Sequence, residues 1–309
     1  IFVLYAASVG VKTLLRAQQI TAFETTRTVL AFLLAAVSLA DFAQPHGLVI
    51  LGVTCLVLSA ASYAAVFTVF ACASAQRNGG SRNGNIFSAW SAALLLAGSF
   101  LCLPQLASLA LLAAAALTSA WLSKRPRWRA FAFYGMVFLL AAAAGSGLLS
   151  FLASALVGTP NGGPSAPVWL IAVCALLCYV LVAPDREASR TQQILHLAFA
   201  ALATCAVMAL VINGLVALTA LRVIPGAHHL ALIRTIVLCA AAIALVSGGA
   251  RYQQRELKGL GYAALALVAV KLVVEDLRHG HLAYIAASIF LVAFTLIAAP
   301  RAARVRLKS

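Results

Sequence analysis

The sequence predicts an all-α fold, a polytopic transmembrane helix bundle of about ten spans arranged in tandem hairpins. Three observations support this prediction: the apolar composition, a series of long apolar runs, and basic residues confined to alternate loops. Of the 309 residues, 64% are hydrophobic and only 9% are charged, and the mean hydropathy is +1.02. Soluble domains carry roughly 25% charged residues. The composition therefore excludes a soluble enzyme, a disordered chain and a disulfide scaffold.

Ten apolar runs approach or exceed the length of a membrane-spanning helix, which is about 17 to 25 residues. The runs are continuous and show no alternation of apolar and polar residues, so they predict helices and not the strands of a barrel. Three of them are long enough that we expect them to tilt or protrude. The ten runs cover residues 28–43, 47–74, 86–103, 106–122, 130–157, 167–183, 194–221, 230–250, 259–274 and 282–299.

The formal net charge of +15 arises from 22 Lys and Arg residues, most of which lie in every second loop. Eighteen occur in six segments, whereas the five intervening loops hold only Arg222 and Arg278. Such a bias marks the cytoplasmic side of a membrane protein. It predicts a multi-pass protein with a cytoplasmic C-terminus, facing anionic lipid headgroups on that side. Nucleic acid is not an expected partner. The six basic segments are 12–27, 76–85, 123–129, 184–193, 251–258 and the residues after Pro300.

The predicted organisation has three parts. Residues 1–27 form a partial N-terminal span and a cytoplasmic basic segment, residues 28–300 form the bundle, and residues 301–309 form a basic cytoplasmic tail. The apolar start at Ile1 is expected to be the end of a span that began earlier. Alanine is frequent in nearly every run, which favours close helix packing.

One group of charged residues and histidines gathers at the predicted outer ends of the last four spans. Charges in a membrane are costly, so they usually have partners and a purpose. Lys271 and Glu275 are four residues apart and share a helix face, so we expect them to pair. Asp276 is then free to meet Arg234 or Arg278. This candidate cluster is either a clasp joining three helices or a substrate or ion site. Its members are Arg222, His228, His229, Arg234, Lys271, Glu275, Asp276, Arg278, His279 and His281.

The histidines raise two further possibilities. His228, His229, His279 and His281 are candidate ligands because zinc and copper accept imidazole, although the spacing is a weak signal for a metal site. His196 lies inside a span near its cytoplasmic end, where a haem or pigment would need an axial ligand, but no second histidine lies within a span. The sequence thus predicts no metal site and identifies no cofactor.

The remaining polar residues give no catalytic motif. Asn213 lies in the middle of a span and is expected to bond to a neighbouring helix. The chain contains no nucleophile elbow, no HExxH sequence and no pair of carboxylates within a span. We therefore predict no catalytic residues.

The C-terminal region resembles an uncharacterised family of bacterial polytopic predicted membrane proteins. The resemblance rests on Gly261, on Lys271 ten residues later and on Asp276 five residues after that, followed by one more span and a basic end. An arginine that often opens the family's last span is absent here, where residues 281–285 are His-Leu-Ala-Tyr-Ile. The resemblance implies a bacterial plasma (inner) membrane location and draws attention to Lys271 and Asp276, but it implies no activity.

The sequence favours a non-enzymatic integral membrane protein that serves as a structural or accessory subunit of a larger membrane assembly. Charge within the spans is scarce and catalytic motifs are lacking, and other membrane subunits are the expected partners. One alternative is a transporter or lipid-handling protein with an outer-facing charged pocket around Lys271. Another is a cofactor- or pigment-bearing electron-transfer subunit.

Overall fold

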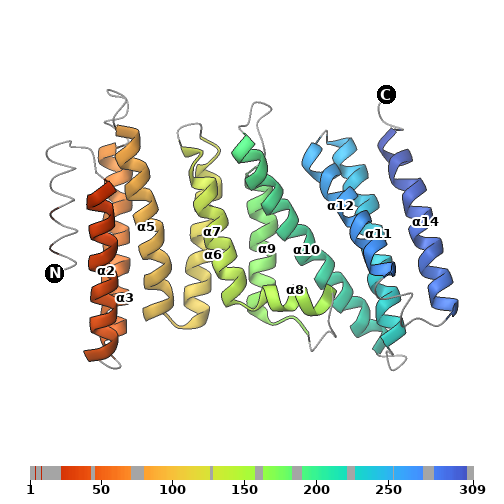
Figure 1. Ribbon diagram of the computed structural model, residues 1–309, viewed down its shortest axis with the longest axis horizontal. Coiled ribbons are helices and arrows are strands. Elements are labelled where there is room, and N and C mark those ends of the chain that lie inside the picture. Colours follow the sequence, from red (N-terminus) through yellow and green to blue (C-terminus); the bar gives the residue numbers. More distant parts are fainter. Residues whose placement is uncertain are drawn as a thin grey trace. The chain divides into compact units, whose positions relative to one another are not determined.

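A computed structural model describes residues 4, 8, 22–42, 46–70, 80–125, 128–156, 163–182, 190–220, 227–252, 254–273 and 282–304. Every regular element in these ranges is a helix, as expected for a chain that must satisfy its backbone hydrogen bonds internally in lipid. The helices are α2 (Ala22–Phe42), α3 (His46–Ala65) with the π-helical turn η1 (Val66–Phe70), α5 (Gly80–Cys102), α6 (Gln105–Leu122), α7 (Phe131–Gly145), α8 (Leu148–Leu156), α9 (Ala166–Leu181), α10 (Arg190–Ala220), α11 (Ala227–Arg251), α12 (Arg255–Lys271) and α14 (Leu282–Arg304) (Figure 1).

The all-α prediction is confirmed for the described ranges, and each of the ten apolar runs contains a helix. Not all of these helices have the length and hydropathy of a complete span. The described chain holds five that do, and the bent pair formed by α7 and α8 would be a sixth. The ten-span count therefore remains a prediction. The five helices are Gly47–Thr68, Asn83–Cys102, Gln105–Leu122, Arg190–Thr219 and Leu230–Arg251.

The chain divides into two compact units, Ile1–Ala115 and Ala116–Ser309, with the boundary inside α6. In the first unit α3 and α5 cross closely because glycines remove side chains from the contact. A Cβ atom on Gly98 would stand 2.8 Å from the carbonyl oxygen of Gly52, and one on Gly52 would stand 2.9 Å from the backbone nitrogen of Cys102. The Ser59 hydroxyl also donates to the Ser91 carbonyl oxygen at 2.8 Å. Close backbone approach and a buried hydrogen bond are the usual means by which helices associate in lipid.

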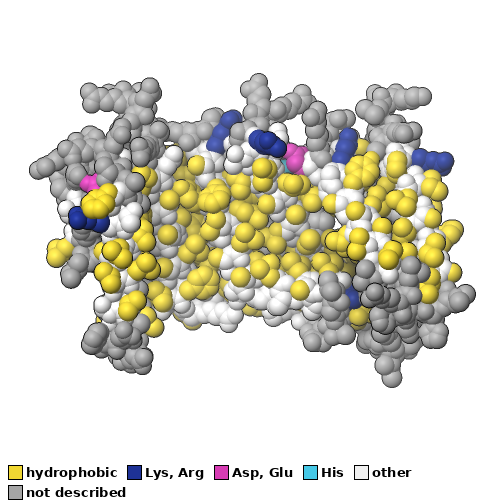
Figure 2. Space-filling model, viewed as in Figure 1, with side chains coloured by type: hydrophobic (Ala, Val, Ile, Leu, Met, Phe, Trp, Pro, Cys, Tyr) yellow, Lys and Arg dark blue, Asp and Glu magenta, His cyan; other side chains and the backbone are white. Residues whose placement is uncertain are grey.

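In the second unit, α11 is the central helix of the C-terminal group of helices. It contacts α10, α12 and α14. A buried apolar cluster is shared by these four helices: Met208 and Ile212 on α10, Val237, Leu238 and Cys239 on α11, Val268 on α12 and Val292 on α14. Over the second unit, Figure 2 shows hydrophobic side chains across the middle of the face in view and most of the visible Lys and Arg along one edge, as expected for a surface that faces lipid.

The apolar run 130–157 differs from its prediction. Instead of one long helix that tilts or protrudes, it forms α7 and α8, whose axes differ by 71°. The two helices meet at Ser146 and Gly147, and Gly147 has a φ of 76°, which side-chain-bearing residues rarely adopt. The Ser146 hydroxyl accepts a hydrogen bond from the backbone N–H of Leu148 at 3.3 Å. The excess length is therefore used to redirect the chain within the bundle.

Gly261 allows α12 to approach α11, and we predict that Gly261→Ala destabilises the protein by about 1–3 kcal/mol because overpacking forces the backbones apart. An added Cβ would stand 2.9 Å from the backbone nitrogen of Val246 and 3.1 Å from the carbonyl oxygen of Ala242. The free energy of unfolding, measured by SDS titration, gives the effect.

Gly259→Ala on the same helix is the matched control, because nothing lies within 4 Å of its Cβ position. That change should be neutral or stabilise the helix by about 0.5–1 kcal/mol. Equal stability of the two variants would contradict the close α11–α12 contact.

Candidate functional site

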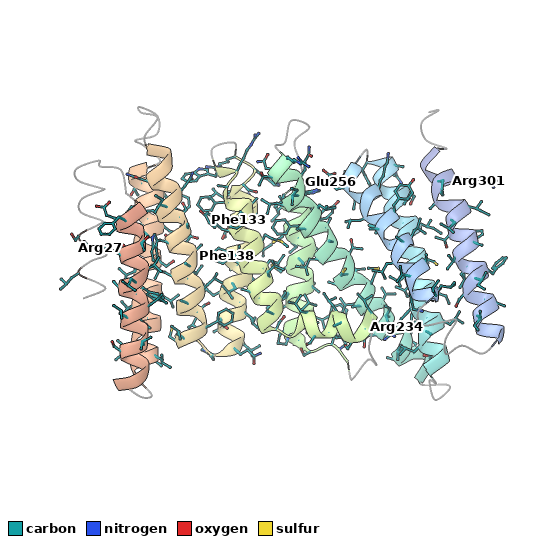
Figure 3. The ribbon with its side chains drawn as sticks, in the orientation of Figure 1. Arg27, Phe133, Phe138, Arg234, Glu256 and Arg301 are labelled. Carbon is teal, nitrogen blue, oxygen red and sulfur yellow. The ribbon has the colours of Figure 1, made fainter. Side chains whose placement is uncertain are left out.

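Arg234 lies in the second turn of α11, with only 2% of its surface exposed. Its Nε donates a hydrogen bond to the Ala155 carbonyl oxygen at 2.7 Å, and its Nη2 donates to the Ser154 carbonyl oxygen at 3.1 Å. Both acceptors belong to the last turn of α8. The arginine therefore joins α11 to the bent pair formed by α7 and α8, at the end of the second unit where α8 lies (Figure 3).

The C-terminus of α8 explains why a cation is buried at this position. The last four carbonyl groups of a helix lack intrahelical partners, and the helix dipole places a partial negative charge at the same end. The guanidinium supplies hydrogen-bond donors to two of those carbonyls as well as an opposing charge. Charge-assisted hydrogen bonds of this kind are about twice as strong as neutral ones, which offsets the cost of burying Arg234.

Lys271 is the last residue of α12 and is nine-tenths buried. Its Nζ donates to the Ala231 carbonyl oxygen at 3.0 Å and to the Thr235 hydroxyl at 2.9 Å. The Thr235 hydroxyl in turn donates to the same Ala231 carbonyl at 3.1 Å. The lysine thereby binds α12 to the part of α11 that carries Arg234.

Arg234, Thr235 and Lys271 thus form one unit, which we call the cation clasp. Residues 231–235 of α11 contact α8 through Arg234 and α12 through Lys271, so three helices meet there. The sequence placed both cations near each other without identifying their acceptors. The predicted pairing of Lys271 with Glu275, and of Asp276 with Arg234 or Arg278, involves three residues outside the described ranges: Glu275, Asp276 and Arg278.

The candidate histidines are divided between two places. His228 and His229 lie in the first turn of α11, but their side chains are outside the description, as are His279 and His281 altogether. Among the described residues, no group of three or more His, Cys, Asp and Glu side chains is arranged to hold a metal ion. His196 is only 1% exposed and lies on α10 away from the cation clasp.

A second polar cluster surrounds His196 and was not predicted. The Tyr179 ring on α9 lies against the imidazole, with the ring centres 4.8 Å apart. The Tyr179 hydroxyl donates to the Gln254 side-chain oxygen at 2.8 Å. Glu256, near the start of α12, acts electrostatically on both rings. Figure 3 shows Glu256 and Arg234 at opposite ends of the second unit.

One feature of the sequence could have indicated the break between α7 and α8, which the prediction missed. The run Gly145-Ser-Gly147 inside an overlong apolar stretch is a signal for a helix break, since Gly and Ser pairs are common at kinks. The expectation for Asn213 was wrong, because its side-chain amide donates to the Ala209 carbonyl of its own helix at 3.0 Å. No side-chain pattern identifies the carbonyls of Ser154 and Ala155 as the acceptors of an arginine on another helix.

Comparison with protein-family models, with curated proteins and with solved structures finds no match for the chain. The resemblance of the C-terminal region to an uncharacterised membrane-protein family therefore remains an expectation. Of the residues that carry it, Gly261 and Lys271 both contact α11, and Asp276 is outside the described ranges.

Removal of either cation should destabilise the protein, and by different amounts. Arg234→Met leaves two carbonyls at the end of α8 without their charged donors, so we expect a loss of about 2–4 kcal/mol. Lys271→Met should cost about 1–2 kcal/mol, because the Ala231 carbonyl keeps the Thr235 hydroxyl as a donor. The free energy of unfolding measures both effects.

Arg301→Met is the control, since this arginine is exposed near the C-terminal end of α14. It should change stability by no more than about 0.5 kcal/mol. An Arg234→Met protein as stable as Arg301→Met would show that the cation clasp does not hold the helices together.

Proposed function

We propose that the protein is an integral membrane transporter or lipid-handling protein for an anionic substrate, with the cation clasp as its substrate site. The observation that carries the proposal is the broken span, formed by α7 and α8, whose second helix ends on the buried guanidinium of Arg234. Discontinuous helices recur at the substrate sites of transporters, where their C-terminal ends hold cations. Here the cation at the C-terminal end of α8 is the Arg234 side chain.

The chemistry of the cation clasp supports an anionic substrate. The hydrogen-bond acceptors of Arg234 and Lys271 named above are carbonyl and hydroxyl oxygens, which orient the two cations. Arg234 carries one positive charge, and the Lys271 ammonium, bonded to the next residue Thr235, carries the other. Such a pair suits a carboxylate or phosphate, which guanidinium and ammonium groups recognise. Ionisable groups within membrane spans commonly mark such pathways.

The distribution of Lys and Arg supports an orientation for this site. The basic loops favour a cytoplasmic C-terminus in the bacterial plasma membrane, where they meet anionic headgroups. The cation clasp then lies toward the outer side of the membrane. A substrate would reach it from outside the cell or from the outer leaflet.

A structural or accessory subunit is the second candidate, and the same contacts favour it. Both cations donate hydrogen bonds to the protein's own backbone, which is what a clasp between helices requires. In that case the helices α8, α11 and α12 form a rigid unit that presents its surface to other membrane subunits.

Transport by the purified full chain in proteoliposomes tests the proposal. The probes are radiolabelled inorganic phosphate, radiolabelled succinate and fluorescent phosphatidylglycerol. We expect at least one probe to move with saturable kinetics, at least tenfold faster than in empty liposomes. Lys271→Met should reduce the rate by at least tenfold, whereas Lys271→Arg, which retains the charge, should keep a measurable part of it.

Arg301→Met serves as the matched control and should transport like the wild type, and each variant is compared only after it elutes as a folded species in gel filtration. A wild-type protein that moves none of the probes, and that retains stoichiometric partners when purified from native membranes, would support the accessory-subunit function instead.

A further inference from the structure

The Nδ1 atom of His196 is the one buried side-chain nitrogen or oxygen in the described part of the chain that has no hydrogen-bond partner. Leaving a buried polar group unpaired costs about 1–3 kcal/mol, and nearly all such groups in proteins are paired. An apolar residue of similar size at this position would avoid that cost. The imidazole therefore needs a reason other than packing.

Two neighbours of His196 favour a positive charge on the ring. Tyr179 covers it with an aromatic face at a centroid distance of 4.8 Å, and aromatic faces attract cations. The Tyr179 hydroxyl is held by Gln254, which fixes the ring in place. The carboxylate of Glu256 acts on the imidazole from α12. Burial penalises the charged imidazolium and is the larger effect at His196, and the Glu256 carboxylate offsets part of that penalty.

Other described ionisable groups lie near the end of α10 that carries His196, on α10 itself or on helices that pack against it. Their charges also affect the cost of protonating His196. The Arg251 guanidinium is exposed and lies over the Tyr252 ring at 5.9 Å. The other groups are Arg129 and Tyr134 near the start of α7, Arg190 on α10 and Lys258 on α12.

We propose that His196 is a proton-binding site that couples movement of the anionic substrate at the cation clasp to uptake of a proton at the opposite end of the second unit. In the resting state the imidazole carries its hydrogen on Nε2, and the lone pair of Nδ1 is open. A proton from the aqueous phase at this end of the protein reaches the partly exposed Glu256 and passes to Nδ1. An N–H bond forms, the imidazole becomes an imidazolium, and no electron transfer or further reactant is needed.

This inference rests on the proposed transport function, so its first test does not require transport. Histidine ring nitrogens are followed by ¹⁵N NMR between pH 5 and 8 in protein labelled only at histidine, reconstituted in nanodiscs. His196 is assigned by comparison with His196→Gln or, if that variant does not fold, His196→Asn. We expect His196 to change reversibly from neutral to imidazolium in this range while the fold is retained.

Two variants separate a proton site from a passive buried ring. Glu256→Gln should lower the midpoint of the His196 titration by about one pH unit, because the imidazolium loses its carboxylate. Arg301→Met, at an exposed position on α14, is the control, and its midpoint should stay close to that of the wild type. A His196 that stays neutral down to pH 5, or a midpoint that ignores Glu256→Gln, would overturn the proposal.

The coupling itself is tested in the proteoliposomes with the probe that the wild type transports. A pH gradient should accelerate wild-type uptake at least tenfold, and His196→Gln should abolish that acceleration while uptake driven by a membrane potential persists. An equal response of both proteins to the pH gradient would refute the coupling. If the wild type transports no probe, the transport function fails and the coupling fails with it, but the NMR titration still decides whether His196 binds a proton.

Discussion

The second unit depends on the hydrogen bonds from Arg234 to the last turn of α8. A helix that ends within a bundle leaves carbonyl groups that lipid cannot satisfy. The guanidinium satisfies two of them and opposes the dipole of the helix. The break at Gly147 and the burial of Arg234 are therefore mutually dependent, because each would be costly without the other. Lys271 then fixes α12 to the same part of α11, which gives the site its second cation.

The rest of the second unit is arranged by ordinary membrane packing. Apolar side chains such as Phe290 and Val270 are largely exposed at the surface, where lipid is a suitable solvent for them. Close contacts occur where small residues permit them, as at Gly261 against Ala242 and Val246. Against this background the two polar clusters stand out because they are buried and contain ionisable groups. One contains Arg234 and Lys271, and the other contains His196, whose Nδ1 has no hydrogen-bond partner. The proposed transport of an anion coupled to a proton rests on this pair of clusters.

The sequence was sufficient for the fold class and the positions of the helices, because an apolar run in lipid has no alternative to a helix. It also directed attention to Arg234 and Lys271, since charges are rare in such runs. The break between α7 and α8 was missed because an apolar stretch shows where a chain is buried and not where its backbone turns. The partners of Arg234 and Lys271 include backbone carbonyls, which every residue possesses, so no residue pattern could reveal them. The stacking of Tyr179 on His196 depends on how α9 and α10 pack, which the sequence of neither helix determines by itself.

The most direct test of the account is the position of α8 with and without its arginine. Spin labels at Ser150 on α8 and at Tyr252 after α11, in a cysteine-free background, report the distance between these sites by pulsed electron paramagnetic resonance in nanodiscs. We expect one narrow distance distribution in the protein with Arg234 and a broad or shifted one in Arg234→Met, with Arg301→Met unchanged. An equally narrow distribution at the same distance in Arg234→Met would show that α8 is held by other contacts, and that the arginine does not fix its position.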